Sequence, residues 1–158
     1  MRKRILVGTL VVGALMVFSS SVALADDNWI GTWKLNVAKS TFSPGPAPKS
    51  RTIKFEVTPA GTKFTADDVD ARGKPGHTSW TSKLDGKDVP YEGNPNADTA
   101  APKRVDDNTY TNAWKKDGKA TIEAKVVVSA DSKSLTITQT GKNAKGEVVN
   151  NTAVYERQ

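Results

Sequence analysis

Hydrophobic and polar residues alternate along most of this chain, and a period of two is typical of a β-strand with one buried face. In "RTIKFEVT" (51–58), Ile53, Phe55 and Val57 fall on one face, with charged and polar residues between them. No segment after the first 25 residues keeps the 3.6-residue period of an amphipathic helix. The pattern therefore predicts an all-β fold. Further segments of this kind are 77–84, 108–115, 120–129, 134–140 and 147–157.

Turn residues between these segments indicate how the strands connect. "DG" at 85–86 and at 117–118 supplies the positive-φ residues that two-residue hairpins require. Hairpins join antiparallel neighbours, and closing a long sheet removes its two unpaired edges. We therefore expect an antiparallel meander of eight to ten strands closed into a barrel. The proline-containing stretches 43–50 and 92–102 are expected to be loops, because proline cannot donate to a strand ladder.

The first 25 residues have the features of a cleaved export signal. Arg2, Lys3 and Arg4 precede a short apolar run, and "ALA" at 23–25 offers small residues at a cleavage site. An uncleaved N-terminal anchor is the alternative. We expect cleavage after Ala25, one domain over 26–158, and a periplasmic or secreted protein with no membrane span in its mature chain.

Composition bounds the chemistry of this exported chain. It has no cysteine, so neither disulfides nor thiol chemistry are expected. Without the three basic residues of the leader, 20 Lys and Arg stand against 17 Asp and Glu, a net charge of +3. These charges are interspersed and form no concentrated basic stripe, so nucleic acid is not an expected partner.

The predicted inner face combines aromatic and polar side chains. In a barrel of about eight strands, such a face either packs solid or encloses one small ligand. Both interpretations remain open from the sequence. If there is a cavity, its expected lining residues are Phe55, Trp80, Tyr110, Asn112, Trp114 and Tyr155.

The stretch "GTWKLNVAKSTF" (31–42) resembles the first strand of the calycin superfamily, which includes lipocalins and fatty-acid-binding proteins. Gly31 and Trp33 match the G-x-W motif of lipocalins, where the tryptophan closes one end of the barrel. The resemblance implies that Arg157 stacks on the Trp33 ring, an arrangement with a cation–π rationale. It thus implies a lipocalin-like or fatty-acid-binding-protein-like barrel with Gly31, Trp33 and Arg157 as a structural plug.

The last strand departs from the fatty-acid-binding pattern. Those proteins commonly place an Arg two residues before a Tyr, and this chain has Ala153 before Tyr155. The usual carboxylate anchor is therefore missing. Across residues 26–158, the chain also resembles a group of uncharacterised exported bacterial proteins that are described only as lipocalin-like.

Catalytic and metal-binding patterns are not recognisable. His77 is the only histidine and follows a turn-like "RGKPG", so we expect an exposed loop histidine. Asp67, Asp68 and Asp70 do not have the spacing of an EF-hand and are expected to form a solvated acidic turn. We expect no enzyme activity, no metal and no cofactor.

The sequence thus leads to one hypothesis and one rival. The hypothesis is an exported barrel that binds or sequesters a small apolar or amphipathic molecule in its interior. The rival is a structural or interaction module whose solid barrel acts through its surface loops. The sequence does not determine the oligomeric state.

Overall fold

Ten antiparallel strands form one sheet in residues 27–158, the part of the chain that the computed structural model describes. The expected leader, 1–25, lies outside the described residues. The strand order is β4-β3-β2-β1-β10-β9-β8-β7-β6-β5, so every hydrogen-bonded neighbour is also a chain neighbour except β1 and β10. The strands are β1 (Gly31–Leu35), β2 (Ser50–Thr58), β3 (Gly61–Val69), β4 (Pro75–Ser82), β5 (Val89–Pro90), β6 (Thr99–Arg104), β7 (Thr109–Lys116), β8 (Lys119–Val128), β9 (Ser134–Lys142) and β10 (Val148–Arg157), with a 3-10 helix, η1 (Val37–Lys39), after β1.

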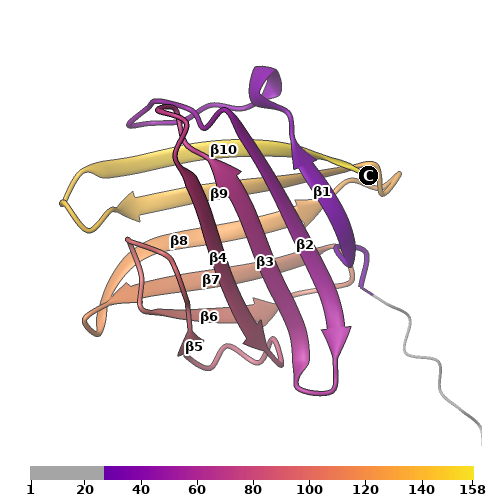
Figure 1. Ribbon diagram of the computed structural model, residues 1–158. Helices are drawn as coiled ribbons and strands as arrows, with labels where there is room; N and C mark the ends of the chain where they lie inside the picture. Colours follow the sequence, from indigo (N-terminus) through magenta and orange to yellow (C-terminus); the bar gives the residue numbers. More distant parts are fainter. Residues whose placement is uncertain (1–26) are drawn as a thin grey trace, which may run out of the picture.

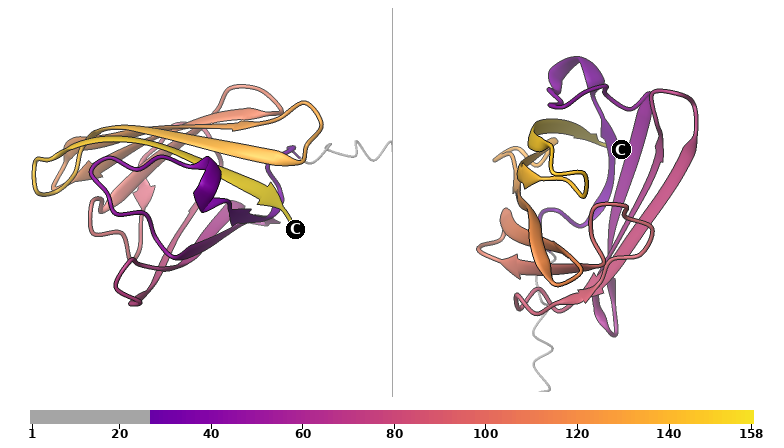
Figure 2. Two further views of the ribbon diagram at one scale, coloured as in Figure 1. Left: turned by 90° about the horizontal axis from the view of Figure 1, so that it is seen from above. Right: turned by 90° about the vertical axis from the view of Figure 1, so that its left-hand side faces the viewer.

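The sheet folds over on itself into two layers. Figure 1 shows β1 to β4 crossing in front of β6 to β10, and the views in Figure 2 show the two groups facing each other. The layers are continuous where β1 pairs with β10, in a register that sets Trp33 opposite Arg157. This arrangement encloses most of the inner face of the sheet between the layers, and the core forms there.

The barrel closes at a seam between β4 and the segment around β5. Ser79 and Glu92 form an isolated antiparallel bridge, in which the backbone N–H of each donates to the carbonyl of the other, at 3.1 and 2.9 Å. A second bridge joins Asp85 to Lys103. The two ends of the sheet thus meet through single bridges instead of a ladder. The expected fold class, an all-β antiparallel meander of eight to ten strands closed into a barrel, is confirmed, with closure nearly complete.

The alternation read from the sequence matches the buried faces of most strands. On β8, Ile122, Ala124, Val126 and Val128 are buried, while most residues between them are exposed. Val57 is an exception, because it is 64% exposed near the end of the β2–β3 hairpin. An inward position buries a side chain only where the opposite layer reaches it.

The two "DG" turns differ in their outcome. Asp117 and Gly118 have φ values of 51° and 73° and join β7 to β8 as a two-residue hairpin, as expected. The hairpin expected at Asp85–Gly86 is wrong, because the chain there leaves β4 and crosses to the other end of the sheet. Gly86 donates its backbone N–H to the Pro102 carbonyl of β6 at 2.9 Å. The residue types of a turn do not by themselves distinguish a hairpin from a bend that begins a longer connection.

The loop expected over 92–102 is partly wrong, because its last residues belong to β6. Pro102 is buried in this strand, opposite Asn112 of β7. Its carbonyl faces Gly86, on the side away from β7, so the missing N–H costs no bond in the β6–β7 ladder. The expected acidic turn is also partly wrong, since Asp67 and Asp68 lie within β3 and only Asp70 lies in the turn that follows.

Candidate functional site

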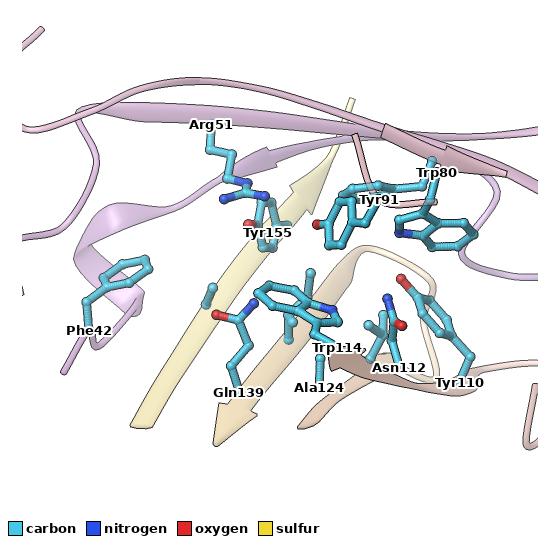
Figure 3. Close-up of a pocket in the computed structure, with 14 residues that line it drawn as sticks. Phe42, Arg51, Trp80, Tyr91, Tyr110, Asn112, Trp114, Ala124, Gln139 and Tyr155 are labelled. Carbon is cyan, nitrogen blue, oxygen red and sulfur yellow. The ribbon is translucent and has the colours of Figure 1, made fainter. Parts of the chain in front are cut away.

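A partly enclosed cavity of about 50 Å³ lies between the two layers. Figure 3 shows side chains from both layers converging on it. Half of its 14 lining residues are aromatic. Apart from Phe42, which follows η1, these aromatic residues come from β3, β4, β7 and β10 and from the segment after β5. They are Phe64, Trp80, Tyr91, Tyr110, Trp114 and Tyr155.

The aromatic walls are packed against one another. Phe64 and Trp80 are stacked with ring centroids 5.3 Å apart, and Tyr91 meets Trp114 edge-on at 5.3 Å. Tyr110 lies edge-on to Trp80 at 6.2 Å. Such pairs contribute about 0.5–1.5 kcal/mol each beyond the area that they bury, so the wall has a defined shape.

Several buried polar atoms around this cavity have no hydrogen-bond partner. Within the described residues, five buried side-chain atoms lack a partner, and three of them belong to cavity-lining residues: Arg51 Nε, Asn112 Oδ1 and Trp114 Nε1. The other two are Trp29 Nε1 and Thr78 Oγ1. Leaving a buried donor or acceptor unsatisfied costs about 1–3 kcal/mol, so a water molecule or another polar group in this cavity would gain hydrogen bonds to these atoms.

Three tyrosines of the wall remain protonated over a wide pH range. Burial is the main cause that raises the pKa of Tyr91, Tyr110 and Tyr155, most strongly for Tyr110. The positive charge of Arg51 partly opposes the increase for Tyr91 and Tyr155. At neutral pH these hydroxyls are therefore uncharged and able to donate a hydrogen bond.

The structure brings most of the expected lining residues together. Trp80, Tyr110, Asn112, Trp114 and Tyr155 all line the cavity. Their role in binding stays a prediction.

Phe55 is not part of the lining and packs behind it. Its ring lies 5.2 Å from that of Phe64 and 5.8 Å from that of Tyr110. It therefore supports the wall of the cavity from within the core.

Sequence reasoning missed Arg51, Tyr91 and Gln139 in the lining. Arg51 is two residues before Ile53 on β2, so its parity already placed it on the inner face. Gln139 likewise shares the parity of Leu135 and Ile137 on β9. Tyr91 stands between β5 and a loop, where no alternation reveals its direction.

At one end of the barrel, Arg157 covers the fully buried ring of Trp33. The guanidinium carbon lies 4.1 Å from the ring centroid. A Cβ atom on Gly31 would lie 2.8 Å from Arg157 Nη1, so glycine makes room for the guanidinium at this position. The role of Gly31, Trp33 and Arg157 as a plug stays a prediction.

His77 lies on the outer surface, away from the cavity. It is exposed as expected, although it belongs to β4 and not to a loop, and its Nδ1 is 2.6 Å from Asp67 Oδ1. In residues 27–158, no group of three or more acidic or histidine side chains is arranged to hold a metal ion. No helix in that part of the chain is long and apolar enough to cross a membrane.

Comparison with known proteins finds matches among solved structures. No family model matches the chain, and no curated protein matches it. A crystal structure of zebrafish ileal bile acid-binding protein complexed with cholic acid is 10% identical, with a TM-score of 0.47. The match covers 83% of this chain and 99% of that protein.

Proposed function

We propose that this protein binds one small amphipathic molecule inside its barrel. The observation that carries the proposal is the set of unpartnered polar atoms of Arg51, Asn112 and Trp114 around an aromatic cavity. A core that served stability alone would gain from apolar residues at these positions, because unpaired buried polar groups destabilise the folded state. A ligand with a polar end and an apolar end would satisfy them and fill the aromatic space.

The volume of the cavity sets a condition on this function. At about 50 Å³ it holds a few water molecules, since one water needs about 10–15 Å³ on this measure. Pockets for drug-sized ligands measure about 300–1,000 Å³. Binding of anything larger than a few heavy atoms therefore requires lining side chains to move. Phe42, which is only partly buried and comes from the loop after η1, is the lining residue least held by strand pairing.

The same small volume favours the second candidate, a structural or interaction module with a nearly solid barrel. In that case, water molecules satisfy the polar atoms and the outer surface carries the function. Both candidates predict a stable barrel. They differ in whether a ligand from solution can enter the cavity and leave it.

We also propose that the protein works outside the cytoplasm, in the periplasm or as a secreted protein, and is not an enzyme. The support for export is the basic and apolar pattern of residues 1–25. The support for a non-catalytic role is that His77, the only histidine, faces solvent on β4, away from the cavity. N-terminal sequencing of the protein from its native host tests cleavage after Ala25.

Ligand binding is tested with the purified protein and an environment-sensitive dye. We expect saturable dye fluorescence and displacement of the dye by amphipathic molecules extracted from the same cells. The control is Ala124→Val, because Ala124 lines the cavity on β8 and two extra methyl groups would take up its space. This variant should stay folded and lose the dye.

Two results would contradict the proposal. One is the absence of any saturable binding to the wild-type protein. The other is equal binding by wild type and a folded Ala124→Val, which would place the dye on the outer surface.

A further inference from the structure

Arg51 directs a positive charge into the interior of the barrel. It lies on β2 with the same parity as Ile53 and Phe55, both of which are buried. Figure 3 shows its guanidinium extending from the upper layer toward Tyr155. Its Nε is buried without a hydrogen-bond partner.

The charge of this guanidinium is balanced only at a distance. Burial lowers the pKa of Arg51, but Tyr155, Tyr91 and Asp68 raise it by more, so that the pKa lies above its ordinary value. Arg51 is the only charged residue in the lining of the cavity, and no carboxylate of residues 27–158 lies within 4.0 Å of its nitrogens. Asp68, its partner in the β2–β3 register, is the nearest candidate. Its carboxylate lies over Gly76 of β4, with Oδ2 3.1 Å from the place of a Gly76 Cβ. The lining of the cavity itself therefore carries one positive charge, and Asp68 lies outside that lining.

The groups that surround Arg51 in the cavity can donate hydrogen bonds. The hydroxyls of Tyr91 and Tyr155 are protonated, because burial raises the pKa of both. The Gln139 side-chain oxygen already accepts a bond from Asn151 Nδ2 at 3.1 Å, which leaves its amide nitrogen to donate. Figure 3 shows Tyr155 next to the Arg51 guanidinium, Tyr91 beside Tyr155, and Gln139 reaching up from the opposite layer.

We propose that the polar end of the ligand is a carboxylate, held by Arg51 with help from Tyr155, Tyr91 and Gln139. This inference rests on the proposed function and adds the chemical class of the ligand. A carboxylate accepts several hydrogen bonds and matches the planar fork of a guanidinium. A cation would meet the like charge of Arg51, and an alcohol would leave the guanidinium without an anionic partner at hydrogen-bond distance.

The test compares three probes that share one apolar chain: octanoate, octan-1-ol and octylamine, which are negative, neutral and positive at pH 7.5. Binding is measured by calorimetry and by the fluorescence of Trp80 and Trp114, which line the cavity. We expect octanoate to bind about 10- to 100-fold more tightly than octan-1-ol, the range for hydrogen bonds to a charged group. Octylamine should bind most weakly.

Variants of Arg51 locate the origin of the preference. Arg51→Gln should remove the preference for octanoate over octan-1-ol and leave the affinity for the alcohol within about threefold of wild type, since a polar side chain of similar reach remains. Arg51→Lys should restore part of it, because the charge returns without the planar fork. The matched control is Arg72→Gln, which removes one positive charge from an exposed turn. It should keep the wild-type preference.

The outcomes separate this inference from the proposed function. If octan-1-ol or octylamine binds as tightly as octanoate, the carboxylate inference is wrong and ligand binding stands. If Arg51→Gln keeps the octanoate preference, the anion is recognised elsewhere and the inference is also wrong. If none of the three probes binds to wild type at millimolar concentration, the proposed function and this inference fail together. Should Arg51→Gln not fold, the comparison of the three probes on wild type decides.

Discussion

Replacing Arg157 with alanine should destabilise the barrel by about 3 kcal/mol, because one side chain ties together both ends of the described chain. Its Nε donates to the Ser132 carbonyl at 2.7 Å and its Nη1 to the Ile30 carbonyl at 2.9 Å, while Nη2 donates to the Asn28 carbonyl. The guanidinium also lies over Trp33. The loss is therefore concentrated at the closed end of the barrel.

The magnitude follows from these contacts and their exposure. A hydrogen bond from a charged donor is worth about 1.5–3 kcal/mol, so three such bonds set an upper bound of about 4.5–9 kcal/mol. Arg157 is only half-buried, and water can replace part of what is lost at the three carbonyls. The cation–π contact adds about 0.5–2 kcal/mol. About 3 kcal/mol is a central value after this compensation.

Equilibrium unfolding in urea at 25 °C and pH 7, followed by tryptophan fluorescence and circular dichroism, measures the effect. With a slope of about 2 kcal/mol per molar urea, the midpoint should fall by about 1.5 M. Arg157→Lys should lose about half as much, because lysine keeps the charge near the ring but cannot reach three carbonyls at once. Arg72→Ala, in an exposed turn, should stay within about 0.5 kcal/mol of wild type. A loss of less than about 1 kcal/mol for Arg157→Ala would refute the plug.

Three further predictions concern glycines and tyrosines. Gly31→Ala should cost about 2–3 kcal/mol in urea unfolding, because its φ is +132° and the new Cβ would meet Arg157 Nη1 at 2.8 Å; an unchanged midpoint would show that the guanidinium moves freely. Gly118→Ala should cost only about 1 kcal/mol in the same assay, since its φ of +73° is unfavourable but no atom lies within 4 Å of the new Cβ, and a loss as large as that at Gly31 would contradict this contrast. Stability should fall above about pH 10, because Tyr91, Tyr110 and Tyr155 keep their protons in the folded state after the unfolded chain has lost them at its pKa of 10.0. Each of these tyrosines contributes at most about 1.4 kcal/mol per pH unit in that window, and alkaline melts without such a fall would argue against their burial.

The sequence predicted the inner faces of the long, strongly alternating strands. Trp80, Tyr110 and Trp114 could be placed toward a common interior because each lies on an alternating segment whose other face is mostly Thr, Ser or Lys. The Asp117–Gly118 hairpin was predictable because both of its residues adopt positive φ. These features depend on local periodicity and turn chemistry alone.

The features that the sequence did not reveal depend on contacts with the opposite layer of the barrel. β3 was not among the predicted strands, because Ala66 and Asp68 occupy inward positions where a large apolar residue would mark the pattern. Arg51 was missed because an arginine at a strand end usually points to solvent, whereas here the opposite layer covers it. The resemblance indicated that Ala153 stands where fatty-acid-binding proteins have the arginine that binds a carboxylate. Only the fold shows that the guanidinium of Arg51, on β2, faces Tyr155.

The position of β1 in the sheet has a consequence for how the protein folds. β1 is hydrogen-bonded to β2 on one side and to β10 on the other, so its second ladder joins the first and last strands of the described chain. Contacts between such distant segments form slowly, because the intervening chain must first be ordered. During synthesis, β1 to β4 and β5 to β9 can each pair in succession, but β1 and β9 both keep a bare edge until β10 has emerged. Until then, the growing chain is exposed to edge-to-edge association, and the tenth strand ends that risk.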